Sequence, residues 1–117
     1  MATDLEGNKK LQRFIELLAD LNRQTVQVLK TGDAELLIEM NGTVEEMYSI
    51  QHGSKEEAFT AIDEDMQIIY QNFNAVVVMI KTNEKAFVDK TTSEAVRKFL
   101  HNIFDANVRI VIAYGLA

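Results

Sequence analysis

The stretch Phe59–Ile80, "FTAIDEDMQIIYQNFNAVVVMI", decides the fold. Its large apolar side chains recur alternately every three and four residues, at Phe59, Ile62, Met66, Ile69, Phe73, Val76 and Ile80. That spacing places them on one face of an α-helix, because a helix turns once in about 3.6 residues. Gly53 and a capping-box pattern at Ser54 and Glu57 precede the run. We therefore predict one long helix over residues 54–82 that packs against other helices.

Three further segments show the same alternation. The first ends at Gly32 and carries Leu11, Phe14, Leu18, Leu21 and Val28. The second lies between Asp33 and Gly53 and carries Leu37, Met40, Val44 and Met47. The third follows "TTSE", another capping-box pattern, and carries Val96, Phe99, Ile103, Ala106, Ile110 and Ala113. We predict an all-α fold, an antiparallel up-down four-helix bundle with a long third helix, as a single domain over residues 1–117, with residues 1–8 left open as a solvated tail.

Two segments also fit strands. "AVVVMI" and "VRIVIAY" are rich in β-branched residues, which favour extended structure. The alternative is an α+β fold with short strands near 75–81 and 108–114. Two strands alone form a poor sheet, so this alternative requires pairing with a second chain.

Composition excludes several classes of function. The chain has no cysteine, which rules out disulfides, thiolate metal sites and thiol nucleophiles. Its net charge of -6 disfavours binding of a nucleic-acid backbone. The first ten residues lack the apolar region of a signal peptide, and no apolar run approaches the roughly 20 residues that span a bilayer. We expect a cytoplasmic protein with neither nucleic acid nor membrane as a partner.

No catalytic residue, metal ligand or cofactor site is predicted. Neither His52 nor His101 has a glutamate or a second histidine three or four residues before it, as helical metal sites require. In "RKFLH", Arg97–His101, three residues separate arginine from histidine, where the helical HEPN ribonucleases have four to six. The acidic run Asp63–Asp65 is consecutive and fans around a helix, which indicates a solvated face rather than a metal site.

An apolar tip is the first candidate surface. A helix over 54–82 would be about 43 Å long and the preceding helix about 30 Å, so the run "AVVVMI" would project by about two turns. The predicted protein-binding patch consists of Val77, Val78, Met79, Phe87 and Val88. Contiguous exposed apolar patches of this kind usually mark partners. In the alternative interpretation, Phe87 and Val88 fold back as a lid and the tip belongs to the core.

The C-terminal segment "IVIAYGLA" is the second candidate surface. This segment lacks the polar face of an amphipathic helix, and its predicted partner-binding residues are Val111, Tyr114 and Leu116. Alternatively, it docks into the groove between the first and third helices.

These patterns favour a non-enzymatic protein–protein interaction module that binds through an apolar patch. Its partner would be a second copy in a homo-oligomer or another protein in a heteromeric complex, with adaptor, chaperone or immunity-type roles. The alternative function is a helical, metal-dependent nucleotide hydrolase or nuclease that uses surface carboxylates or His101.

Overall fold

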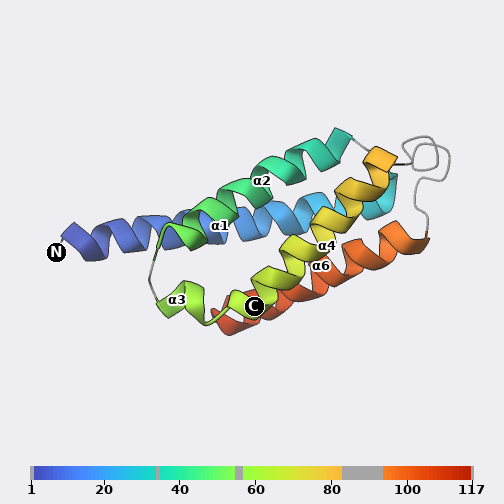
Figure 1. The fold of residues 1–117 in the computed structure, drawn as a ribbon. Coiled ribbons are helices and arrows are strands. Elements are labelled where there is room, and N and C mark those ends of the chain that lie inside the picture. Colours follow the sequence, from blue (N-terminus) through green and yellow to red (C-terminus); the bar gives the residue numbers. More distant parts are fainter. Residues whose placement is uncertain (1, 34, 55–56, 83–93, 117) are drawn as a thin grey trace.

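A computed structural model describes residues 2–33, 35–54, 57–82 and 94–116 of the chain. These residues form five helices and no strand: α1 (Ala2–Thr31), α2 (Glu35–His52), α3 (Glu57–Thr60), α4 (Asp63–Thr82) and α6 (Glu94–Ala113). The four long helices lie side by side, and the short α3 crosses one end (Figure 1). The predicted all-α helical bundle is confirmed. No described helix is both long enough and apolar enough to cross a membrane.

A short turn folds α2 back beside α1. Gly32 has a φ of 66°, a conformation that glycine adopts without a steric penalty, and its N–H donates to the Val28 carbonyl at 2.8 Å. The Asp33 carboxylate then accepts the Glu35 N–H at 3.0 Å, which caps the first turn of α2. The local sequence thus both stops one helix and starts the next.

The periodic apolar residues meet in one core. Its fully buried large side chains are Phe14, Leu17, Leu18, Leu21, Met40, Met47, Phe59, Ile62, Met66, Ile69, Leu100 and Ile103. The ring of Phe14 meets that of Phe59 edge to face, with centroids 5.2 Å apart. Burying each such side chain stabilises the fold by roughly 1.5–3 kcal/mol. Thr25 is the polar interruption on α1, and its hydroxyl donates to the Leu21 carbonyl at 2.6 Å.

The structure differs from the predicted helix over 54–82, because that segment is divided. α3 ends at Thr60 and α4 begins at Asp63. The acidic run Asp63–Asp65 occupies the first turn of α4, where carboxylates stabilise a helix by interacting with its positive N-terminal end. The sequence alone indicates only a solvated face for these carboxylates.

The predicted projection of the apolar tip is consequently wrong. α2 has 18 residues and α4 has 20, so their lengths differ by about 3 Å rather than by two turns. Within the apolar run, Val76 is buried, Val77 and Met79 are half-buried, and Val78 is 49% exposed. α2 and α4 are therefore almost equal in length, and α4 does not have the predicted excess of two turns.

The alternative strands near 75–81 and 108–114 are also wrong. Residues 75–81 lie inside α4 and residues 108–113 inside α6. β-Branched residues have only a weak preference for strands, and burial of a helical apolar stripe overrides it. α2 continues without a break through Asn41, Gly42 and Thr43, where the Thr43 hydroxyl donates to the Glu39 carbonyl. α1 extends back to Ala2, through residues left open as a tail.

Candidate functional site

Three of the four seams between the long helices are closely packed. α1 packs against α2 and α6, and α4 packs against α6. A polar contact also crosses each of these seams: Arg13 to Glu46, the Asn107 amide to the Leu18 carbonyl, and Arg109 to Asp65. Over the described residues, α2 and α4 do not approach each other as closely. We call the region between α2 and α4 the open seam.

The open seam contains an apolar groove. The groove has a volume of about 270 Å³ and is lined by Asn41, Val44, Glu45 and Tyr48 of α2 and by Tyr70, Phe73, Asn74 and Val77 of α4. Val44 and Phe73 are buried and form its floor. Two further apolar side chains on the same two helices are exposed, Ile38 at 75% and Val78 at 49%. Helical spacing places Ile38 on the same side of α2 as Asn41, Glu45 and Tyr48.

Aromatic rings close the groove at the end nearer α3. The centroid of the Tyr48 ring lies 4.1 Å from that of the His52 ring and 5.2 Å from that of the Tyr70 ring. The Tyr48 and Tyr70 rings meet edge to face. Tyr48 and His52 are four residues apart and so share one face of α2. Tyr48 nevertheless remains 52% exposed, so one side of this aromatic group faces solvent.

A hydrogen-bonded chain crosses the open seam at the same end. The Tyr70 hydroxyl donates to Gln51 Oε1 at 2.6 Å, and Gln51 Nε2 donates to the Asp63 carboxylate at 3.0 Å. The pKa of the Tyr70 phenol is raised, mainly because the side chain is buried and to a lesser extent because Tyr48 and Asp63 lie nearby. Tyr70 therefore remains a protonated donor at neutral pH and ties α4 to α2.

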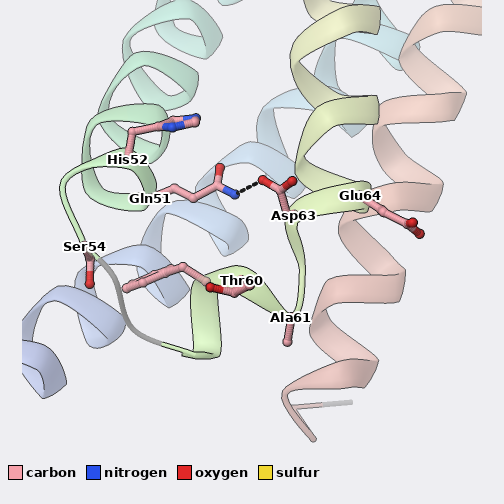
Figure 2. A pocket seen from close by; sticks show the side chains of 8 residues that line it. Gln51, His52, Ser54, Thr60, Ala61, Asp63 and Glu64 are labelled. Carbon is pink, nitrogen blue, oxygen red and sulfur yellow. Dashed lines mark hydrogen bonds between the residues drawn. The ribbon is translucent and has the colours of Figure 1, made fainter.

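Beyond this chain lies a polar cleft of about 440 Å³, lined by Gln51, His52, Ser54, Phe59, Thr60, Ala61, Asp63 and Glu64. Figure 2 shows the Gln51–Asp63 bond crossing the cleft and the Glu64 carboxylate directed away from it. Across the described part of the chain, no three His, Cys, Asp or Glu side chains are grouped so that they could hold a metal ion. The Asp63 carboxylate already accepts a hydrogen bond from the Gln51 amide, so its role in the cleft is that of a structural polar contact.

His101 lies on the other side of the bundle. It lines a shallow groove of about 300 Å³ between α1 and α6 with Val26, Leu29, Lys30, Arg97 and Phe104. No carboxylate belongs to this lining. The structure thus separates His101 from the acidic run at the start of α4.

The predicted tip residues do not form one surface. Val77 lines the groove and Val78 is exposed on α4, whereas Met79 packs against the core. Phe87 and Val88 lie outside the described residues. The structure therefore brings only part of the predicted patch to the open seam.

The predicted C-terminal residues lie at the other end of α4. Tyr114 packs against the core, and its hydroxyl donates to the Ala58 carbonyl of α3 at 2.6 Å. Val111 is half-buried, while Leu116 is 48% exposed beyond Gly115, which has a φ of 69°. The Leu116 N–H donates to the Val111 carbonyl, which ends α6 in a Schellman turn.

The apolar stripe of Leu37, Met40, Val44 and Met47 includes only one residue of α2 that lines the groove, Val44. Tyr48, which lines the groove, and Ile38, which is exposed on the same side of α2, lie outside that stripe. Such apolar side chains outside the stripe were the available signal, since a helix with one buried face should carry polar residues elsewhere.

No protein-family model, curated protein sequence or solved structure matches the chain, so its candidate site is defined by its own geometry.

Proposed function

We propose that this protein is a non-enzymatic protein–protein interaction module whose open seam takes a helix from another protein chain. One observation carries the proposal: α2 and α4 leave an apolar groove between them and lie further apart than the helices of the other three seams of the described bundle. Binding of an amphipathic helix in a groove between helices is a common mode of peptide recognition. A bound helix would complete the packing on the free flanks of α2 and α4.

The groove has the composition of an interface. Its floor of Val44 and Phe73 offers apolar surface, and the rings of Tyr48 and Tyr70 offer large, rigid contact area. Asn41 and Asn74 line its edges and supply amide donors and acceptors. An apolar centre with a polar rim is the usual anatomy of a protein–protein interface.

The proposal keeps part of the patch expected from the sequence. Val77 and Val78 belong to the proposed surface, whereas the participation of Phe87 and Val88 stays a prediction. Val111 and Leu116 remain a separate candidate surface. Self-association, an adaptor, chaperone or immunity-type role, and a cytoplasmic location also stay predictions, and so does the hydrolase or nuclease alternative.

The test compares two pairs of exposed residues. Ile38→Glu with Val78→Glu places charge on the open seam, and Val108→Glu with Ile112→Glu makes the matched change on the outer face of α6. All four positions are at least 36% exposed, so each double variant should fold. The sedimentation of each protein over a wide concentration range would detect self-association.

A photo-crosslinking amino acid replacing Tyr48 would identify the bound chain, whether a second copy or another protein. We expect the seam variant, Ile38→Glu with Val78→Glu, to lose binding. The α6 variant, Val108→Glu with Ile112→Glu, should retain it. Retention of binding by the seam variant would overturn the proposal, and loss in the α6 variant alone would assign binding to the other surface.

A further inference from the structure

The negative charge of the chain is concentrated in the segment that forms the open seam. Residues 33–82 contain ten carboxylates and two lysines, whereas the rest of the chain contains eight carboxylates and ten lysines or arginines. This segment includes α2, α3 and α4. The half of the bundle that carries the groove is therefore strongly acidic, and the other half is slightly basic.

Within the described part of this segment, two carboxylates take part in ion pairs. Among the ion pairs of the described residues, those that reach this segment join Glu46 to Arg13 and Asp65 to Arg109. Glu45 lines the groove, where its carboxylate accepts a hydrogen bond from the Asn41 amide at 3.2 Å. The edge of the groove thus holds a negative charge in place.

We infer that the occupant of the open seam is a basic amphipathic helix of a partner protein; this inference rests on the function proposed above. Its apolar residues, spaced at i, i+3 or i+4 and i+7, pack on Val44, Phe73 and Val77. Its lysine or arginine side chains face the Glu45 carboxylate at the edge of the groove and the net negative charge of residues 33–82. The exposed ring of Tyr48 adds a surface that attracts a cation.

Charge also disfavours two other occupants. A second copy that packed seam against seam in a symmetric dimer would bring the same acidic surface of both copies together, and juxtaposed like charges oppose association. An acidic helix would meet the same repulsion. Opposite charges accelerate association instead, and this effect weakens as salt is added.

The test uses three synthetic helical peptides of 18 residues, the length of α2. They share one apolar face, and their polar faces carry lysine and arginine, glutamine, or glutamate. Fluorescence anisotropy measures their binding to the full chain at low and high salt. We expect the basic peptide to bind at least about tenfold more tightly than the acidic one, with a difference that shrinks at high salt.

Matched variants locate the effect. Glu45→Lys should reduce the preference for the basic peptide more than Asp105→Lys, which makes the same charge change at an exposed position on α6. Ile38→Gln with Val78→Gln should weaken the binding of the basic peptide.

The outcomes separate this inference from the proposed function. Binding of all three peptides with equal affinity at the seam would overturn the basic partner but keep the interaction module. Binding of none would overturn both. A sedimentation dimer that Ile38→Gln with Val78→Gln abolishes would replace the basic helix by a second copy.

Discussion

The α1–α6 seam and the α2–α4 seam are both formed by two antiparallel amphipathic helices and both carry a shallow groove, yet the helix backbones lie closer together in the first. In the α1–α6 seam, Asn107 is 1% exposed and its amide donates to the Leu18 carbonyl at 3.0 Å. In the α2–α4 seam, Val44 and Phe73 form the floor of a groove of about 270 Å³. Apolar periodicity therefore specifies which face of a helix points inward, but not whether the flank beside that face is covered.

The largest expected difference between the two regions is in stability. Phe14→Ala removes a fully buried ring that contacts Phe59, so we expect it to lower the free energy of unfolding by about 3–5 kcal/mol. Tyr48→Ala removes a half-exposed ring from the open seam and should cost less than about 1 kcal/mol. Chemical denaturation measures both values. Similar losses would mean that the seam is packed like the core.

A charge placed in each seam sharpens the comparison. Asn107→Asp puts a carboxylate at a buried position against the Leu18 carbonyl, and we expect a loss of about 3 kcal/mol at neutral pH. Because burial raises the pKa of a carboxyl group, this loss should diminish in acid. The control is Asn74→Asp, at an exposed position of the open seam, with an expected change within about 0.5 kcal/mol. An equal loss of stability in both variants would contradict the conclusion that Asn107 is buried and Asn74 is exposed.

Alkaline pH tests the contact between the end of α6 and α3. Burial raises the pKa of Tyr114 to about 12 in the folded state, against about 10 in an unfolded chain. The folded protein thus holds this proton more tightly, and the resulting stability is present below about pH 10 and is lost as pH rises toward about 12. The denaturation midpoint should fall over this range. The denaturation midpoint of Tyr114→Phe should fall less steeply with pH. An equally steep fall in this variant would count against the contact between the end of α6 and α3.

A smaller effect is expected where the open seam is tied together. Tyr70→Phe removes the hydroxyl that donates to Gln51 and should lower the free energy of unfolding by about 1 kcal/mol. Tyr48→Phe removes a hydroxyl from an exposed side chain and should be nearly neutral. Equal effects in thermal denaturation would show that the Tyr70–Gln51 bond does not stabilise the seam.

The smallest expected effect concerns the hydrolase or nuclease alternative. For an interaction module, magnesium or manganese should leave the thermal midpoint unchanged. A ligand that binds the native state raises the midpoint by mass action, so a reproducible rise would favour the metal-dependent enzyme.

Much of the fold followed from local patterns. The alternation of Phe14, Leu18 and Leu21 predicted the buried face of α1, and Gly32 predicted its end. The division between α3 and α4 was missed, because apolar spacing continues from Phe59 through Ile62 without a gap. The acidic first turn of α4 was the one local signal of a helix start.

Less of the candidate site followed from the sequence. The sequence predicts Val77 and Val78 as interface residues, but for a projecting tip that the structure does not form. Tyr48 and Tyr70 were not identified. Their rings lie 5.2 Å apart although 22 positions separate them, and their contact depends on how α2 and α4 are aligned.

The sequence by itself determined the helical class, the inward face of each long helix and the concentration of negative charge in residues 33–82. All three depend on the order of residues along the chain, through the period of the helix and through composition. Only the tertiary structure decided that the α2–α4 flank stays open and that Tyr48, Gln51, Tyr70 and Asp63 meet across one end of it. Those features depend on how closely separate helices pack, which is set by the side chains of the whole core acting together.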